Sequence, residues 1–473
     1  MLGLHLLDSG LALARDGTAV AATPSLVYAP PAAAAATTTA GEHRALGADA
    51  AALFRARPLD VSTRHWIDIA TRSAAASAAL PIAGAEIAQR LRTANGSEPD
   101  GAAAVVVPAL FDAPALGAVL SLLRQQGLRV TQFIDAAVLA AGATRAAGTS
   151  IVIEIGLHHF SATRVDSDAA RTRRRRSRSS TRAGLVALQE LWLQLVSEAM
   201  VRRTRFDPLH DAQSEQRLFE ALPAALSTAA ASGQARVAVD SGAETFEVTL
   251  TRDQFATRAA PIYREWIALI HELRSAGQRV CLVAPRFAAA LPGFDAMLDQ
   301  FSGCPLYLLD ATTLAVAASR LPDGPGEAVD RAVRLARQLD PATLAACLDP
   351  AAASSQHRLL GALPAARAAP THVLYEGRTW ALRGAVVEVG REPAAGGIAL
   401  PEGTAGLSRL HCSLVDAGGE ILLLDHSRYG SFVNGERVAG RVRLAAGDVL
   451  RVGDPGVECA LIAVGEWDAT PPR

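Results

Sequence analysis

The alternation of strand and helix patterns within residues 102–143 constrains the fold of this chain more than any other feature. AAAVVVPAL indicates a buried strand, DAPALGAVLSLLRQQG indicates an amphipathic helix that ends at a glycine, and RVTQFIDAAVLAAGA indicates a strand that leads into a helix. Further along, SIVIEIGLHHFSATRV and ARVAVDSGAETFEVTLT are typical of strand hairpins, and RVCLVAPRFAAALPGFDAMLDQF of a strand, a loop and a helix. Strands that alternate with helices predict an α/β domain over residues 1–325.

The texture of the sequence changes after this region. Residues 326–350 have the pattern of an amphipathic helix, and residues 351–370, AAASSQHRLLGALPAARAAP, have the Ala- and Pro-rich composition of a linker. Residues 371–465 consist of short strand patterns separated by Gly turns, and residues 466–473 form a tail. We therefore predict a second, all-β domain over residues 371–465.

The composition is that of a globular protein with balanced charge. The length of 473 residues is enough for roughly two to four domains. Half of the residues are apolar, which allows a sizeable core. All 46 basic residues are arginines, and the chain has 47 acidic residues. The resulting net charge of −1 gives no general attraction to nucleic acid or membrane. The five cysteines lack metal-ligand spacing and fit a reducing compartment. Asp8 interrupts the N-terminal apolar run, and no run approaches the roughly 20 residues of a membrane span, so we expect a cytoplasmic protein without a membrane partner.

A set of spaced polar and Gly residues distinguishes the predicted all-β domain. A Gly-Arg pair at 390–391 is followed by Ser408-x-x-His411 and then by a tract that runs from Asp425 to Asn434-Gly435. This spacing resembles that of a forkhead-associated (FHA) domain. The resemblance covers the whole segment, and it implies a β-sandwich that binds phosphothreonine peptides.

The chemistry of phosphate recognition agrees with this resemblance. A phosphothreonine carries about −1.5 to −2 charges and three acceptor oxygens, and a guanidinium can donate to two of those oxygens at once. We therefore expect Arg391 to hold the phosphate, with the Ser408 hydroxyl as a second donor. In SRYG, Tyr429 stands where the family commonly has an Asn that contacts the peptide backbone. The candidate phosphopeptide-binding residues are Arg391, Ser408, Arg409, Arg428 and Tyr429, and the residues with expected structural roles are Gly390, His411, Gly430, Asn434 and Gly435.

Three stretches of residues 1–325 carry a second resemblance. The three stretches are VVVPALFDAPALGAVLSLLRQQGLRVTQFIDAAVLAAGA, FEVTLTRDQF and VCLVAPRFAAALPGFDAMLDQF. In their order along the chain, they are similar to motifs of the nucleotide-binding domain of the heat-shock chaperone and actin superfamily. The resemblance implies an actin-like, two-lobed α/β domain whose ribonuclease-H-like halves flank a nucleotide cleft. It also implies ATP and Mg²⁺ as the cofactors of an active member.

The nucleotide motifs of that family are degenerate in this chain. The first phosphate loop of the family is Asp-x-Gly-Thr, whereas GLHLLDSG has His5 and Leu7 where Asp and Gly belong. The second loop needs an Asp and a Gly run, whereas IEIGLHHF has Glu154 and Gly156 followed by larger side chains. A chain without lysine also lacks the family's catalytic lysine. We therefore expect no cofactor and a degenerate nucleotide cleft, which comprises His5, Asp8, Glu154, Gly156 and His158.

Two further patterns favour structural interpretations. His158 and His159 near Glu154 suggest a metal site, but adjacent strand residues point to opposite faces, so we expect an edge-strand or loop pair and no metal. ARTRRRRSRSSTR is the one charge run, and we expect it to form a solvated loop over residues 171–182. Nucleic acid is a disfavoured partner, since no aromatic residue interleaves these arginines to stack on bases.

These residues favour a phosphothreonine-dependent, protein-binding adaptor in which an FHA reader is fused to a catalytically inactive actin-like scaffold. The expected partner is a threonine-phosphorylated protein, and the scaffold contacts another protein or self-associates. The alternative is an active chaperone-like ATPase that is regulated through its FHA domain, and nucleotide binding separates the two. A third option, nucleic-acid binding through the Arg run, predicts a steep salt dependence.

Overall fold

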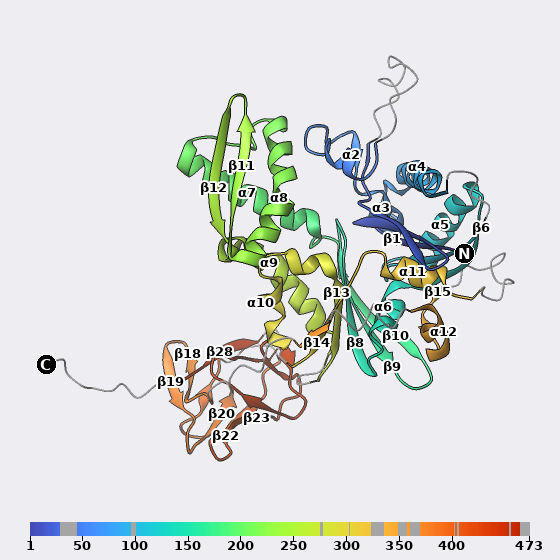
Figure 1. Ribbon diagram of the computed structural model, residues 1–473. Coiled ribbons are helices and arrows are strands. Elements are labelled where there is room, and N and C mark those ends of the chain that lie inside the picture. Colours follow the sequence, from blue (N-terminus) through green and yellow to red (C-terminus); the bar gives the residue numbers. More distant parts are fainter. Residues whose placement is uncertain are drawn as a thin grey trace. The chain divides into compact units, whose positions relative to one another are not determined.

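The computed structural model describes residues 1–28, 45–95, 101–274, 278–301, 303–322, 335–348, 357–359, 369–401, 403, 406–453 and 456–463 of the chain (Figure 1). The chain divides into two compact units. The first comprises Met1–Leu269, Val280–Asp299 and Cys304–Leu360, and the second comprises Ile270–Arg279, Gln300–Gly303 and Gly361–Arg473.

The first sheet of the first unit is mixed. Its strand order is β15-β7-β6-β1-β2-β3. β1, β2 and β3 form an antiparallel meander, and β6 and β7 extend it in parallel on the other side of β1. The strands are β1 (Leu2–Leu7), β2 (Gly10–Arg15), β3 (Thr18–Thr23), β6 (Gly101–Val107), β7 (Leu128–Asp135) and β15 (Leu335–Ala336).

The second sheet repeats this topology. Its order is β16-β10-β9-β8-β13-β14-β17, in which β8, β9 and β10 form the antiparallel meander and β13 and β14 extend it in parallel. Apart from short edge strands, both sheets therefore have the order third, second, first, fourth, fifth. The strands are β8 (Gly148–Ile155), β9 (Phe160–Ser167), β10 (Thr172–Ser180), β13 (Cys281–Pro285), β14 (Pro305–Leu309), β16 (Gln338–Leu339) and β17 (His357–Leu359).

Two helices each follow a strand of one sheet and pack on the other sheet. α6 (Ala136–Thr144) follows the last parallel strand of the first sheet and packs on β8, β9 and β10 of the second. α11 (Thr313–Ser319) follows β14 of the second sheet and packs on β1, β2 and β6 of the first. A Cβ on Gly3 would lie 2.0 Å from the Ala315 carbonyl oxygen, so this close helix–strand approach requires glycine. α6 is buried on every side, as its apolar, Ala-rich sequence predicts.

The outer layer of the first unit covers the two sheets. α3 (His65–Thr71), α4 (Ala76–Asn95) and α5 (Ala113–Gln125) pack together over the first sheet. Their apolar faces form one core with the strands, which includes Trp66, Ile87, Val105, Leu116 and Val119. The remaining elements are α2 (Ala48–Ala51), β4 (Val27–Tyr28), β5 (Val61–Ser62), α7 (Leu185–Thr204), α8 (Ala212–Ser232), β11 (Gln234–Ser241), β12 (Glu244–Thr251), α9 (Arg252–His271), η1 (Arg286–Ala290), α10 (Phe294–Leu298), η2 (Asp299–Phe301) and α12 (Pro341–Cys347).

The patterns that opened the sequence analysis are confirmed as elements. The buried strand, the amphipathic helix and the strand–helix pair correspond to β6, α5, β7 and α6. Asp112 caps the start of α5, since its Oδ1 accepts the Ala115 N–H at 3.0 Å, and Gly127, with a φ of 78°, follows the C-cap residue Gln126. The two predicted hairpins are β8–β9 and β11–β12.

The prediction of a loop over residues 171–182 is wrong. Thr172–Ser180 is strand β10 and pairs with β9 along its length, with a bulge between Arg174 and Arg176. The strand tolerates its charge because carboxylates neutralise it: Arg174 Nη1 lies 2.7 Å from Asp135 Oδ2, and Arg175 Nε lies 2.8 Å from Asp166 Oδ2. Exposed arginines and a bulge on a strand near the sheet edge also disfavour pairing with other chains.

The helix predicted over residues 326–350 and the linker over residues 351–370 are corrected where the structure describes them. Leu335–Ala336 and Gln338–Leu339 are short edge strands, and within residues 335–348 the helix is Pro341–Cys347, whereas residues 326–334 and 349–350 lie outside the described residues. The Asp340 carboxylate caps this helix through the Thr343 N–H at 2.8 Å, and Pro341 occupies the first helical position, where proline is favoured, so the helix begins there. Within the linker, His357–Leu359 pairs with β14.

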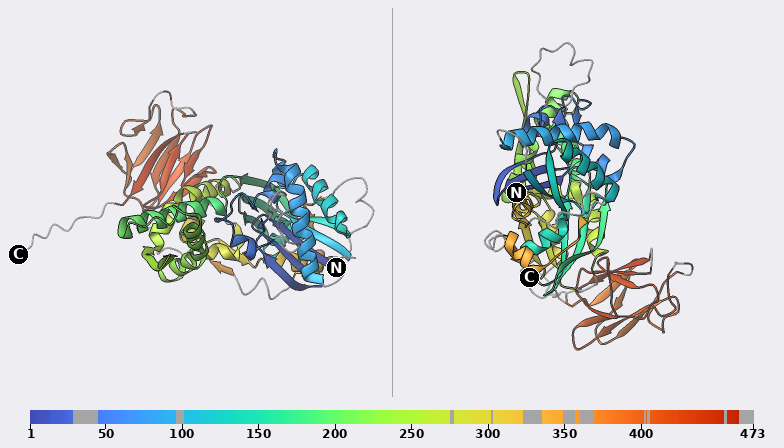
Figure 2. Two further views of the ribbon diagram at one scale, coloured as in Figure 1. Left: turned by 90° about the horizontal axis from the view of Figure 1, so that it is seen from above. Right: turned by 90° about the vertical axis from the view of Figure 1, so that its right-hand side faces the viewer.

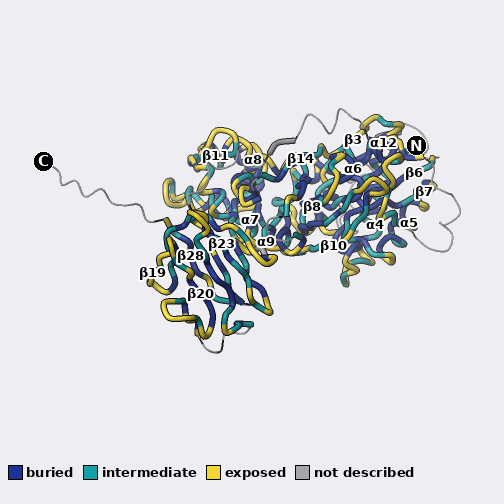
Figure 3. The backbone as a smooth tube through the Cα atoms, turned by 90° about the horizontal axis from the view of Figure 1, so that it is seen from below, coloured by how far each residue is buried: buried dark blue, intermediate teal, exposed yellow. Residues whose placement is uncertain are grey.

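Residues 369–463 of the second unit form a β-sandwich, seen as orange and red strands in Figure 2. One sheet has the order β19-β18-β28-β27-β24-β25 and the other the order β21-β20-β22-β23-β26. Buried residues follow the strands in both units, and exposed residues gather on turns (Figure 3). The strands are β18 (His372–Tyr375), β19 (Arg378–Ala381), β20 (Val386–Gly390), β21 (Ile398–Ala399), β22 (Cys412–Asp416), β23 (Ile421–Asp425), β24 (Ser431–Val433), β25 (Glu436–Arg437), β26 (Arg441–Leu444), β27 (Val449–Val452) and β28 (Val457–Ile462).

Alternating apolar residues explain the sandwich. Val387 and Val389 of β20, Leu414 of β22, Leu423 of β23 and Leu461 of β28 all belong to one buried cluster. Their outward neighbours are polar or partly exposed, which is the pattern of strands that bury one face. None of the helices in the described part of the chain is long and apolar enough to cross a membrane.

Candidate functional site

The loop after β20 lies against the loop before β22. The Arg391 N–H donates to the Ser408 carbonyl oxygen at 3.2 Å, and the Glu392 N–H donates to the Arg409 carbonyl oxygen at 3.0 Å. A Cβ on Gly390 would lie 2.1 Å from the Arg409 carbonyl oxygen, so only glycine permits this approach. The backbone therefore holds Arg391 and Ser408 beside each other.

His411 connects these two loops to a third. The imidazole is buried; Nδ1 accepts the Ser408 N–H at 3.2 Å, and Nε2 donates to the Gly430 carbonyl oxygen at 3.1 Å. This pattern requires the neutral tautomer with the proton on Nε2. Burial lowers the pKa of His411, which favours the same neutral form at physiological pH. The side chain fixes the loops and is not available to a ligand.

The third loop, residues 426–430, exposes Arg428 and Tyr429 together with His426, whose Nε2 lies 2.9 Å from the Ser413 hydroxyl. The Asp425 carboxylate accepts the Ser427 N–H at 3.1 Å, and the Ser427 hydroxyl accepts the Gly430 N–H at 2.7 Å. With its backbone fixed in this way, the loop exposes Arg428 and Tyr429, and 57% of the Tyr429 surface is accessible. A large aromatic ring left in solvent beside two ordered loops is available for contact with a partner.

Asn434 and Gly435 come after the third loop in the sequence and form the turn between β24 and β25. Their φ angles are 52° and 83°, the pair of left-handed values of a type I′ turn. The Asn434 amide also donates to Asp448 Oδ1 at 2.9 Å and accepts the Val449 N–H at 2.9 Å. Both the nitrogen and the oxygen of this amide therefore form hydrogen bonds within the sandwich.

The cations of the three loops have no carboxylate partner among the described residues. Arg391, Arg409 and Arg428 are exposed, and within the described ranges none of them lies within ion-pair distance of a carboxylate. By contrast, Arg443 of the same sandwich pairs with Glu420 at 2.8 Å. Exposed guanidinium groups around a backbone-ordered loop pair are suited to an anionic ligand.

Comparison with known proteins assigns this sandwich. Residues 387–453 match the family model of the FHA domain, and a search of curated proteins finds no match to the chain. The matched range contains all three loops described above. The chain thus carries an FHA domain, which implies phosphothreonine-dependent interaction with protein partners and confirms that part of the resemblance.

The first unit contains a cavity of about 600 Å³ where the two sheets meet. Residues from the ends of β1, β8, β13 and β14 and from α6 and α11 line it. His5 and Glu154 are in its wall, whereas Asp8, Gly156 and His158 lie in the turns β1–β2 and β8–β9. The structure therefore brings the degenerate cleft residues into one region, in two separate groups.

The first group is centred on the buried Asp8 carboxylate. Oδ1 accepts the Leu157 N–H at 2.9 Å, and Oδ2 accepts the His158 N–H at 2.9 Å. His159 Nδ1 lies 3.3 Å from Oδ2, close enough for an ion pair but without hydrogen-bond geometry. Burial opposes ionisation of both groups, but their mutual attraction prevails, so the pKa of Asp8 is lowered and that of His159 is raised.

This arrangement does not suit the phosphates of ATP. The turn amides of Leu157 and His158, which a phosphate loop would offer to its ligand, already donate to an internal carboxylate. A Cβ on Gly156 would lie 2.0 Å from Asp8 Oδ1, so this glycine serves the Asp8 contact and does not open space for a ligand. The β8–β9 turn therefore leaves neither of these two amides free for a phosphate.

The two adjacent histidines have separate partners. They lie in the β8–β9 turn, where His158 Nε2 is 2.8 Å from the Thr63 hydroxyl and His159 faces Asp8. Burial lowers the pKa of His158. The described residues contain no group of three His, Cys, Asp or Glu side chains arranged to hold a metal ion.

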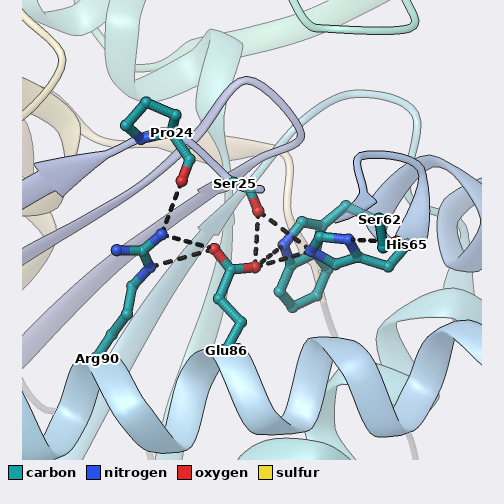
Figure 4. A network of polar contacts seen from close by, with 7 residues as sticks. Pro24, Ser25, Ser62, His65, Glu86 and Arg90 are labelled. Carbon is teal, nitrogen blue, oxygen red and sulfur yellow. Dashed lines mark hydrogen bonds and ion pairs between the residues drawn. The ribbon is translucent and has the colours of Figure 1, made fainter. Parts of the chain in front are cut away.

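Sequence analysis missed a buried polar network at the edge of the first sheet (Figure 4). Glu86 of α4 accepts from Ser25 Oγ at 2.7 Å and Trp66 Nε1 at 2.9 Å, and lies 2.8 Å from His65 Nε2. Arg90 donates to its other oxygen at 3.0 and 3.1 Å. A Ser–His–Glu set invites comparison with a hydrolase, but the serine proton is directed to Glu86 and all three side chains are buried, so the network is structural.

Proposed function

We propose that the protein is an adaptor that docks threonine-phosphorylated proteins through its FHA domain. The observation that supports this most is the backbone-linked pair Arg391 and Ser408. Three exposed guanidinium groups surround the pair, and none of them has a carboxylate partner in the part of the chain that the structure describes. A phosphate between these loops would meet a bidentate donor and a hydroxyl donor together. The rigid sandwich below the loops keeps this arrangement in place before the ligand arrives, which reduces the entropic cost of binding.

We further propose that the two-sheet unit is an actin-like scaffold that does not use nucleotide. Three observations support this: the repeated strand order, the exchange of α6 and α11 between the sheets, and the occupation of the turn amides by Asp8. The scaffold would contact a second protein or another copy of the chain, so that FHA docking brings two partners together. The decisive experiment for the reader function is the Arg391 substitution series described in the Discussion.

A nucleotide test checks the scaffold proposal. We expect the full chain to show no change in Tm with ATP and Mg²⁺ at millimolar concentration, because a ligand that binds the native state must raise its stability by mass action. Differential scanning fluorimetry measures this directly. A clear upward shift accompanied by phosphate release would instead establish an active ATPase.

Tyr429→Asn checks how the peptide main chain is read. In the sequence family this position is commonly Asn, whose amide has a donor and an acceptor for the peptide backbone, whereas Tyr429 has one distant hydroxyl. Because the loop backbone is already ordered by Ser427 and Gly430, we expect the substitution to strengthen phosphopeptide binding by about 0.5–1.5 kcal/mol. Fluorescence anisotropy with a phosphothreonine peptide measures this change.

The opposite result has a distinct meaning. If Tyr429→Asn weakens binding and alters the preference for residues beside the phosphothreonine on a peptide array, the exposed ring is an aromatic anchor. Arg378→Asn, at an exposed position of β19, is the control for a general effect of a surface substitution and should leave the affinity unchanged.

A further inference from the structure

The cavity of the first unit has a mainly aliphatic wall. Its lining includes Leu7, Leu11, Val152, Ile155, Leu309 and Leu314. A volume of about 600 Å³ is within the range of small-molecule sites, which are mostly apolar with a few placed polar groups. The physical question is which ligand such a wall accepts.

Two polar atoms, each on a residue that lines the cavity, are buried and have no hydrogen-bond partner among the described residues. They are Oε1 of Glu154 and Oγ1 of Thr23. Glu154 is 7% exposed, and its other oxygen accepts from the Ser161 hydroxyl at 2.7 Å and the Ala109 N–H at 3.3 Å. A buried polar atom without a partner is costly, so a ligand group that bonds to Oε1 would recover this energy.

The state of Glu154 limits the charge of that ligand. Burial raises the pKa of its carboxyl, with the nearby Asp135 acting in the same direction. Because Oε2 already accepts two hydrogen bonds, a proton on the carboxyl would be carried by Oε1. Oε1 is thus a donor when the carboxyl is protonated and an acceptor when it is ionised, and a hydroxyl or amide group can serve either state.

Few other charges line the cavity. Burial lowers the pKa of His5 to about 4, so its imidazole is neutral at physiological pH. Arg286 and Asp310 are in the wall but form an ion pair with each other. An anionic ligand would therefore meet an aliphatic wall and the Glu154 carboxyl, and would lose its hydration without gaining a counter-ion.

Phe287 marks the solvent side of the cavity. It belongs to η1, lines the cavity and is 39% exposed, which is unusual for so large an apolar side chain. A bound apolar molecule would cover part of this ring.

We propose that this cavity binds an uncharged, mainly apolar small molecule whose hydroxyl or amide group hydrogen-bonds to Oε1 of Glu154. The site occupies the region where the resembled family holds nucleotide, but its chemistry is different. The proposal concerns the first unit only and does not depend on phosphopeptide binding by the FHA domain.

A series of eight-carbon ligands tests the charge preference on the full chain. Nile red, an uncharged dye, reports occupancy by its fluorescence, and octanol, octanoate and octylammonium compete with it. We expect octanol to displace the dye, with octanoate and octylammonium weaker by about tenfold or more. Each ion must be dehydrated, and the raised pKa of Glu154 favours its neutral form, which is not a counter-ion for octylammonium. Tighter binding of either ion than of octanol would overturn the proposal.

Substitutions then locate the site. Ala140→Leu places a larger side chain in the wall and should weaken octanol binding by about tenfold, whereas Ala224→Leu, on an exposed face of α8, should not change it. Phe287→Ala alters a partly exposed residue, so it remains informative if Ala140→Leu fails to fold, and it should weaken binding several-fold. If Ala140→Leu and Phe287→Ala both bind octanol as tightly as wild type, the molecules bind elsewhere. If Ala140→Leu does not fold, wild-type affinity of a folded Phe287→Ala leads to the same conclusion.

Glu154→Gln tests the polar contact separately. Its amide can keep the bonds to Ser161 and Ala109 through its oxygen while turning an NH₂ group, a donor only, to the cavity. We expect octanol, whose oxygen can accept, to remain bound and the discrimination against octanoate to fall. Unchanged discrimination would remove Glu154 from the proposed site.

Discussion

Arg391→Ala is expected to abolish binding of threonine-phosphorylated peptides while the FHA domain stays folded. A hydrogen bond to a charged group contributes about 1.5–3 kcal/mol, and a bidentate guanidinium–phosphate pair lies near the upper end. Loss of that energy lowers affinity by about ten- to 150-fold, which moves a Kd of about 1 μM to about 10–150 μM, where almost no peptide is bound at low-micromolar concentration. Isothermal titration calorimetry with the full chain and a phosphothreonine peptide measures the loss.

The fold should survive because Arg391 contributes only its backbone to the loop structure. Its N–H bond to Ser408 is retained in the Ala variant, and its side chain is exposed. Arg378→Ala, an exposed arginine of β19, is the matched control and should bind like wild type. Arg391→Lys should also bind weakly, since an ammonium group cannot make two parallel hydrogen bonds to one phosphate. Wild-type affinity of Arg391→Ala would move the phosphate site elsewhere.

Much of the FHA site could be predicted because its residues act locally. The positive φ angles at Asn434 and Gly435 and the close approach at Gly390 leave a visible pattern in the sequence. His411 is also close in the chain to Ser408, one of the residues that it orders. What the spacing alone did not show is that Gly430 is the other partner of His411, so that one imidazole fixes the two recognition loops on either side of it.

The first unit shows the limit of the same approach. The strand and helix patterns of residues 102–143 were confirmed because hydrophobic periodicity is a property of neighbouring residues. The contact between Asp8 and the amides of Leu157 and His158 joins positions about 150 residues apart, and no local sequence pattern predicts it. The Arg-rich run was predicted as a loop for the same reason. Its strand is stabilised by ion pairs with Asp135 and Asp166, which the run itself does not contain.

Glu86→Ala is expected to destabilise the first unit by about 3–5 kcal/mol, the usual cost of removing one partner from a buried ion pair. Glu86 is fully buried and receives hydrogen bonds from Ser25, Trp66 and Arg90 (Figure 4). Its removal leaves the Arg90 guanidinium, which is also buried, with the Pro24 carbonyl oxygen at 2.7 Å as its one strong acceptor among the described residues. Urea unfolding followed by tryptophan fluorescence measures the loss, since Trp66 belongs to the network.

Acid should weaken the same network in the wild type. Burial alone would raise the pKa of Glu86, but His65, Arg90 and Ser25 more than offset it, so the pKa is lowered from 4.5 in the folded state. A lowered pKa means that the carboxylate stabilises the fold above pH 4.5 and that this contribution is lost as the pH falls through the folded value. The difference in unfolding free energy between wild type and Glu86→Gln should therefore shrink in acid, whereas Arg92→Ala, an exposed substitution on the same helix, should show little difference from wild type at any pH. A Glu86→Ala variant as stable as wild type at neutral pH would mean that this network does not hold α4 against the sheet.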